Sequence, residues 1–206
     1  MSDKVKPWDE RYSGSEFYYG REPNDFLKLH ADQIRPKGKV LCLAEGEGRN
    51  AVYLASLGFQ VVAVDQSTQG LKKVKQLALE AGVQVETIAA DLDHFEIKRG
   101  FWDGIISIWC HVPPALRKKL HQHVVTGLAP EGILILESYH PRQLDYKTGG
   151  PPTAELMMTM ESLKQELKGL HLNLLQEIDR EVQEGKGHQG KSAVTQCLAQ
   201  KFRVSY

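Results

Sequence analysis

The segment from Lys39 to Asn50 most constrains how this chain can fold. Its first part, Lys39–Leu43, is apolar enough for a strand buried on both faces, which is typical of a central strand in a parallel sheet. Gly46 and Gly48 then permit a tight turn with positive φ angles, and a helix begins at Asn50. The free N–H groups at the start of that helix would face the turn. The segment therefore predicts a strand, a ligand-binding turn and a helix.

The turn has the G-x-G-x-x-A spacing of dinucleotide-binding loops, but its charges favour another ligand. Glu45 and Glu47 flank Gly46, and carboxylates close to a pyrophosphate in a partly desolvated cleft are costly. S-adenosyl-L-methionine (SAM) carries an ammonium, a sulfonium and one carboxylate. The helix N-terminus could take that carboxylate while an acidic side chain meets a positive group. A surface turn without a ligand is the simpler alternative, yet the charges predict SAM.

Strands and helices alternate along the rest of the chain, which predicts an α/β fold with helices on both faces of a mostly parallel sheet. The further expected strands are Gln60–Val64, Val83–Ala90, Phe101–Cys110, Ile133–Glu137, Leu170–Val182 and Lys191–Val204. The expected helices are Pro23–Ile34, Asn50–Leu57, one through Leu71 that ends at Gly82, one that begins near Pro114, and Thr153–Leu167. The glycine-rich link Gln183–Gly190 predicts an antiparallel hairpin between the last two strands.

Polar residues follow several of these strands at one edge of the expected sheet. Asp65 comes 17 residues after Gly48 and ends the second strand, where a carboxylate can accept hydrogen bonds from two ribose hydroxyls. The alternative role for Asp65 is to cap the next helix, for which Ser67 is equally well placed. Asp91 and Leu92 close the third strand and could hold an adenine ring.

The N-terminal residues 3–22 contain many aromatic side chains but little helical or strand periodicity. These side chains are Trp8, Tyr12, Phe17, Tyr18 and Tyr19. A segment of this kind folds over something: it is either a stabilising arm or a lid over a ligand. We therefore treat residues 1–22 as a candidate lid.

The composition fits a single domain over residues 1–206, with 26 basic and 26 acidic residues that cancel. Because the net charge is zero, the protein has no overall positive charge to attract nucleic acid or an anionic membrane, and we expect neither as a partner. The absence of a signal-like apolar run predicts a cytoplasmic protein, either a monomer or a homodimer. No metal is expected either, because His121 and His123 lie two apart on a helix and point to nearly opposite sides.

With these pieces in order, the chain resembles the class I SAM-dependent methyltransferases, among them the tellurite-resistance (TehB-like) and thiopurine methyltransferase relatives. The resemblance is carried by Leu43–Asn50 and Val61–Asp65. It implies a Rossmann-like three-layer sandwich with a seven-stranded, mostly parallel sheet whose last strand is antiparallel. It also implies the cofactor contacts: Glu45, Gly46, Gly48 and Asn50 at the methionine, Asp65 and Gln66 at the ribose, Asp91 and Leu92 at the adenine, and Ile108 and Trp109 opposite.

Methyl transfer from a sulfonium is an in-line displacement, so the protein must mainly align the acceptor and exclude water. A thiol, a selenol or a tellurium oxyanion would need no strong base, and we expect such a small-molecule acceptor. The candidate substrate-binding residues are Tyr19, Arg21, His111, Tyr139 and His140, and His111 is the first candidate if the reaction needs a base. Val112–Ala115 lacks the polar and aromatic residues expected for amine methylation of bases.

Two other functions stay open at this point. The G-x-G-x-x-A spacing and Asp65 would also suit an NAD-dependent oxidoreductase. Many class I methyltransferases have an acidic residue and a glycine where this chain has Cys42 and Ala44. That difference is compatible with a protein that binds SAM without catalysis.

Overall fold

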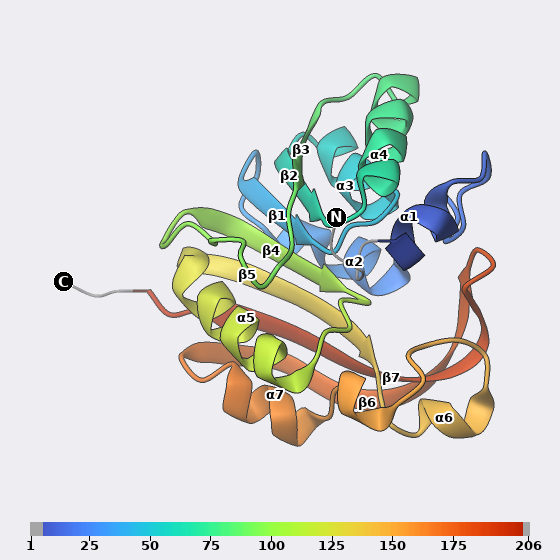
Figure 1. The fold of residues 1–206 in the computed structure, drawn as a ribbon. Helices are drawn as coiled ribbons and strands as arrows, with labels where there is room; N and C mark the ends of the chain where they lie inside the picture. Colours follow the sequence, from blue (N-terminus) through green and yellow to red (C-terminus); the bar gives the residue numbers. More distant parts are fainter. Residues whose placement is uncertain (1–5, 204–206) are drawn as a thin grey trace.

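The computed structural model describes residues 6–203 and contains one seven-stranded sheet flanked by helices (Figure 1). The strands are β1 (Lys39–Leu43), β2 (Gln60–Asp65), β3 (Val85–Ala89), β4 (Trp102–Ile108), β5 (Leu128–Tyr139), β6 (Leu170–Glu184) and β7 (His188–Lys201). The α-helices are α1 (Lys6–Tyr12), α2 (Asp25–His30), α3 (Arg49–Ser56), α4 (Thr68–Glu80), α5 (Pro114–Gly127), α6 (Gln143–Tyr146) and α7 (Met160–Glu166). Two short 3-10 helices are η1 (Ala31–Gln33) and η2 (Ala154–Leu156).

The strand order is β3-β2-β1-β4-β5-β7-β6. Strands β1 to β5 pair in parallel, whereas β7 runs antiparallel to both of its neighbours, β5 and β6. This arrangement confirms the predicted α/β fold with a mostly parallel sheet and an antiparallel last strand. Because β1 and β4 are neighbours although β2 and β3 lie between them in sequence, the chain reverses its direction of winding beside the β1–α3 turn, where such sheets bind ligands.

Alternate residues of the central strands pack into two separate cores, one on each face of the sheet. In β1, Leu41 and Leu43 contact the core that includes α5 and α7. Val40 and Cys42 point to the other face, toward α2, α3 and α4. This period of two explains why β1 is apolar from Val40 to Leu43: a strand covered on both faces has no solvent-facing side. Figure 1 shows α5 and α7 together on one face of the sheet.

Side-chain caps fix where several helices begin. The side chain of Asn24 accepts a hydrogen bond from the Leu27 N–H at the start of α2, and Ser67 does the same for Gly70 in α4. Helix α5 begins with Pro114 in its first turn, where a missing N–H costs nothing. Ser67 and Pro114 were already identified as such signals in the sequence, whereas the Asn24 cap was not.

Several segments differ from the sequence predictions. The helix expected over Pro23–Ile34 is divided into α2 and η1, and β5 begins at Leu128 instead of Ile133. Residues 6–12 form helix α1, although no helical period was recognised there. The helix expected over Thr153–Leu167 is divided into η2 and the shorter α7. Strands β6 and β7 extend further toward each other than expected, leaving only residues 185–187 between them. Residues 1–5 of the expected lid and Val204 of the expected last strand lie outside the described residues.

Within residues 6–203, no helix combines the length and the apolar character that crossing a bilayer requires.

Candidate active site

The turn between β1 and α3, residues 44–48, is here called the cofactor loop. Ala44, Gly46 and Gly48 all have positive φ angles, of 49°, 65° and 99°. A Cβ atom on Gly48 would come within 2.8 Å of the Val74 Cα atom, so the loop lies directly against α4. The glycines therefore serve the predicted positive φ angles, and Gly48 also permits the close approach to α4. Ala44 adopts a left-handed conformation that favours glycine.

Glu45 caps helix α3 from within the cofactor loop. Its Oε1 atom accepts hydrogen bonds from the backbone N–H groups of Asn50 (3.1 Å) and Ala51 (2.8 Å). Burial raises the pKa of Glu45 to about 7, against the lowering effect of these hydrogen bonds. The helix N-terminus, which we expected to take the carboxylate of SAM, is thus already occupied by a carboxylate of the chain.

Glu47 points away from the cofactor loop into a buried ion pair. The residue is 3% exposed, and its Oε1 atom lies 2.7 Å from Lys73 Nζ on α4. Its Oε2 atom accepts a hydrogen bond from the backbone N–H of Tyr19 at 3.1 Å. Of the two glutamates that flank Gly46, only Glu45 keeps its carboxylate close to the start of α3. The prediction that carboxylates at this turn disfavour a pyrophosphate therefore holds for Glu45 and not for Glu47.

Asp65 lies at the carboxyl end of β2, as predicted, and ties that strand to the cofactor loop. Its Oδ2 atom accepts a hydrogen bond from the Gly46 N–H (2.8 Å), and its Oδ1 atom accepts one from the Ser67 N–H (2.7 Å). Burial raises the pKa of this carboxyl. The sequence left open whether Asp65 or Ser67 caps the next helix. The structure shows that Ser67 caps α4. Each carboxylate oxygen keeps a second lone pair for a ribose hydroxyl.

Helix α1 covers the cofactor loop. Tyr12 is 5% exposed, and a Cβ atom on Gly46 would meet its hydroxyl oxygen at 2.9 Å. Asp9 accepts hydrogen bonds through Oδ1 from the Ser67 hydroxyl (2.6 Å) and the Gln69 N–H (3.1 Å), which fixes α1 against α4. The sequence identified these residues only as part of an aromatic segment.

Of the other expected cofactor residues, Asn50 lies in the first turn of α3, and Gln66, Asp91, Leu92 and Ile108 lie at or just after the carboxyl ends of β2, β3 and β4. Asn50 accepts a hydrogen bond from the Asn24 N–H through Oδ1 (2.9 Å), and Asp91 accepts one from the Asp93 N–H (3.0 Å). Leu92 and Ile108 are buried in the two cores, and Gln66 is partly exposed.

Four aromatic side chains from separate segments meet beside this edge. We call Tyr19, Trp109, Tyr139 and His188 the ring cluster. The Trp109 ring stacks on Tyr139, with centroids 4.4 Å apart, and on His188 at 4.9 Å. The Tyr19 ring stacks on His188 at 4.6 Å, and the Tyr139 hydroxyl lies 2.6 Å from His188 Nδ1. Trp109 has a φ of 56°, a backbone conformation that large L residues adopt only at a cost, which is frequent at functional sites.

His111 is close to the ring cluster but is held by the backbone. Its Nε2 atom accepts a hydrogen bond from the Tyr139 N–H at 3.2 Å. A neutral imidazole has one acceptor nitrogen, and here it is in use. Burial lowers the pKa of His111 to about 4, so the ring is neutral at pH 7. Both observations argue against His111 as a general base.

Arg21 and His140, two further substrate candidates, have partners outside the ring cluster. Arg21 is exposed, forms an ion pair with Glu80 on α4, and lies over the Phe17 ring at 4.8 Å. The Nε2 atom of His140 lies 3.5 Å from a carboxylate oxygen of Glu177 on β6. The structure brings Tyr19 and Tyr139 together and leaves these two apart from them.

Sequence reasoning missed His188 and Glu184, which flank the tip of the β6–β7 hairpin. Both are 6% exposed. Glu184 accepts a hydrogen bond from the indole N–H of Trp109 at 2.6 Å. The signal that could have revealed them is the position of a glutamate and a histidine directly on either side of the Gly-Lys-Gly turn.

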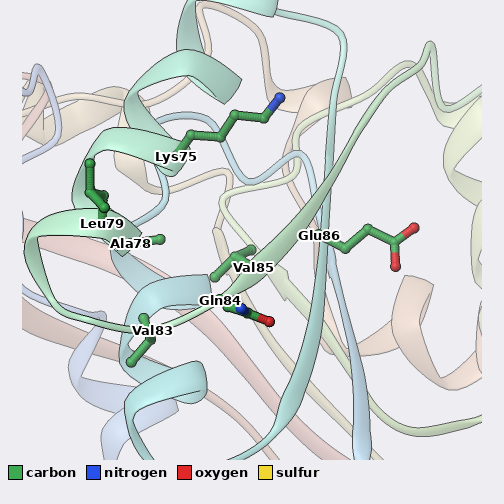
Figure 2. A pocket seen from close by; sticks show the side chains of 7 residues that line it. All are labelled: Lys75, Ala78, Leu79, Val83, Gln84, Val85 and Glu86. Carbon is green, nitrogen blue, oxygen red and sulfur yellow. The ribbon is translucent and has the colours of Figure 1, made fainter.

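An open cleft of about 410 Å³ lies elsewhere, between α4 and the start of β3 (Figure 2). It is lined by Lys75, Ala78, Leu79, Val83, Gln84, Val85 and Glu86. Val85 is the first residue of β3, so the cleft lies at the amino-terminal edge of the parallel strands. The cofactor loop is at the opposite, carboxyl-terminal edge.

Part of the chain is similar to a family of known proteins. Residues 40–132, which contain the cofactor loop and Asp65, match the family model described as a methyltransferase domain. This part of the chain is thus similar to a methyltransferase domain. The match, together with the relatives described below, confirms the resemblance and the SAM cofactor predicted from sequence.

One curated relative of the domain is the probable S-adenosyl-L-methionine-dependent methyltransferase TehB of Haemophilus influenzae (strain 10810). It is 24% identical over 138 residues, which are 62% of this chain and 48% of the relative. The chain thus spans about half the length of the curated relative it matches.

Solved structures share the fold. TehB from Haemophilus influenzae has a TM-score of 0.69 at 19% identity, covering 96% of this chain and 67% of that chain. A structure from work on the conversion of a disulfide bond into a thioacetal group during echinomycin biosynthesis has a TM-score of 0.78 at 15% identity. It covers 98% of this chain and 94% of that chain.

Proposed function

We propose that this protein transfers the methyl group of SAM to a small-molecule acceptor bound at the ring cluster. The proposal is carried by the position of the ring cluster: it lies where β4 and β5 end, at the same sheet edge as the cofactor loop and Asp65. SAM supplies a methyl group on a sulfonium, which leaves as a neutral thioether. Asp65 would hold the ribose, and the cofactor loop would hold the methionine part.

We propose a soft, readily ionised acceptor such as a thiol or a chalcogen oxyanion. Burial lowers the pKa of His188 to about 3 and that of His111 to about 4, so both rings are neutral and poor proton acceptors near pH 7. An acceptor that is already ionised needs no base, whereas a hydroxyl or an amine would. The neutral histidines therefore favour the first kind of acceptor.

The N-terminal segment would act as the lid in this reaction. Tyr12 packs on Gly46, and Tyr19 belongs to the ring cluster, so the segment covers both halves of the site. Closing a site over its substrates excludes water from the transfer. The segment must move for SAM and the acceptor to enter.

The remaining parts of the proposal concern the whole protein. We propose a single cytoplasmic domain over residues 1–206, a monomer or a homodimer, without nucleic-acid or membrane partners. The balance of 26 basic and 26 acidic residues supports the lack of such partners.

The test is turnover of SAM to S-adenosylhomocysteine with a panel of small thiols, selenite and tellurite, alongside amines and alcohols. We expect product with members of the first group. If the protein binds SAM but turns over none of these acceptors, it is a SAM-binding protein without catalysis, and the proposal fails.

A further inference from the structure

A single carboxylate at the tip of the β6–β7 hairpin joins the start of α3, directly after the cofactor loop, to the ring cluster. The Oε2 atom of Glu184 accepts hydrogen bonds from Arg49 Nη2 at 2.5 Å and from Trp109 Nε1 at 2.6 Å. Arg49 is the first residue of α3 and directly follows Gly48. Trp109 directly follows β4. One oxygen atom thus contacts both sides of the site.

The other oxygen of Glu184 is also in use. Its Oε1 atom accepts a hydrogen bond from Asn24 Nδ2 at 2.8 Å and lies 3.3 Å from Arg180 Nη2. Burial acts to raise the pKa of Glu184, but the Arg49 guanidinium and the Trp109 indole outweigh it and hold the pKa below its ordinary value. Glu184 is therefore ionised, and its hydrogen bonds are of the strong, charge-assisted kind.

A second buried carboxylate in the same region lacks these contacts. Glu137 on β5 is 0% exposed and accepts hydrogen bonds from Arg180 at 2.8 and 2.7 Å, and from Gln196 and Asn24. Its backbone carbonyl accepts a hydrogen bond from the Trp109 backbone N–H at 2.9 Å, which a change of the Glu137 side chain leaves in place. Within residues 6–203, none of the hydrogen bonds of the Glu137 side chain involves Arg49 or Trp109. The Glu137 carboxylate is thus comparable to that of Glu184 in burial and ion pairing, but it has no hydrogen bond to the Trp109 indole or to Arg49.

We propose that Glu184 is a positioning residue, which holds the Trp109 ring in register with helix α3 so that the acceptor meets the methyl group. The left-handed backbone of Trp109 costs free energy, so its placement needs support from other parts of the chain. Through Trp109 the constraint reaches Tyr139 and His188, which stack on the indole. This inference rests on the proposed function.

The first test compares the variants Glu184→Gln and Glu137→Gln in steady-state methyl transfer to a small thiol. Glutamine keeps the shape of the side chain but loses the charge that Trp109 and Arg49 share. We expect Glu184→Gln to raise the acceptor KM about tenfold, the effect of losing one charge-assisted hydrogen bond. The KM for SAM should change less than about threefold, because Glu45 and Asp65 still hold the cofactor loop. Glu137→Gln should leave both constants within about threefold.

The second test needs no catalysis. In a Trp8→Phe, Trp102→Phe background, Trp109 is the single tryptophan of the three in the sequence and reports its own surroundings. We expect Glu184→Gln to shift its emission and to increase its quenching by acrylamide, and Glu137→Gln to change neither.

The outcomes separate the two proposals. If both variants change the emission and the acceptor KM alike, or if Glu184→Gln changes only the melting temperature, Glu184 has a merely structural role and the inference is overturned. If the wild-type protein turns over no acceptor, the proposed function fails, and the emission comparison still decides whether Glu184 positions Trp109.

Discussion

The carboxylate of Asp65 accepts a hydrogen bond from the backbone N–H of Gly46 at 2.8 Å. This contact ties the end of β2 to the cofactor loop, so the two parts of the chain that SAM would contact form one unit. The second oxygen of Asp65 binds the Ser67 N–H at 2.7 Å, at the start of α4. Substitution of Asp65 should therefore affect the loop as well as the ribose contact.

Replacing Asp65 by alanine should weaken SAM binding by several-fold to about a hundredfold, because charge-assisted hydrogen bonds to the ribose are lost. Isothermal titration calorimetry measures the Kd directly. Glu86→Ala, an exposed carboxylate on the neighbouring strand β3, serves as the control and should leave the Kd unchanged. Unchanged affinity in Asp65→Ala would show that another residue binds the ribose.

Alanine at Gly48 should destabilise the protein more than alanine at Gly58. Both glycines have positive φ, 99° and 89°, and an L residue there costs about 1–2 kcal/mol. Only at Gly48 would the new Cβ atom clash with the Val74 backbone, whereas nothing lies within 4 Å at Gly58. We expect at least about 1 kcal/mol more loss of unfolding free energy for Gly48→Ala, measured by urea denaturation. Equal losses would mean that the loop can move away from α4.

The stability of the protein should depend on the protonation of Glu45. Its pKa is raised to about 7 in the folded protein, so the contribution of this group to stability is complete below its ordinary pKa of 4.5 and is lost as the pH rises through about 7. Glu45→Gln keeps an oxygen for the Asn50 and Ala51 N–H groups and removes this titration. Relative to wild type, the variant should gain unfolding free energy between about pH 5 and pH 7.5. Parallel curves of unfolding free energy against pH would contradict the expected pKa.

The pH dependence of kcat/KM should follow the acceptor and not a histidine. His111 has a lowered pKa of about 4 and uses its acceptor nitrogen for the Tyr139 N–H, so it cannot serve as the base. With two thiols of different pKa, the midpoint of the pH profile should move with the thiol, and His111→Gln should not change it. A midpoint that is the same for both thiols and disappears in His111→Gln would identify His111 as a general base.

Most of the fold follows from the sequence because its signals are local. The apolar run of β1, the cap at Ser67 and Pro114 at the start of α5 each act within a few residues. Helix α1 escaped prediction because its stability comes from contacts with distant segments, such as Tyr12 on Gly46 and Asp9 on Ser67. Its own sequence carries little apolar periodicity.

The site was predictable only in part, for a similar reason. Asp65 was found because it ends a recognisable strand, whereas His188 and Glu184 depend on how far the two hairpin strands extend. The partner of Glu47 is Lys73 on α4, which no spacing rule relates to the loop. Which carboxylate faces a ligand and which forms an internal ion pair is decided by packing.

The most direct measurement is a calorimetric titration of the wild-type protein with SAM and, separately, with NAD. We expect saturable binding of SAM with a stoichiometry of one and no heat of binding with NAD, because the cofactor loop keeps the Glu45 carboxylate close to the start of α3. Tight binding of NAD together with no binding of SAM would contradict the assignment of this edge of the sheet as a methyl-donor site.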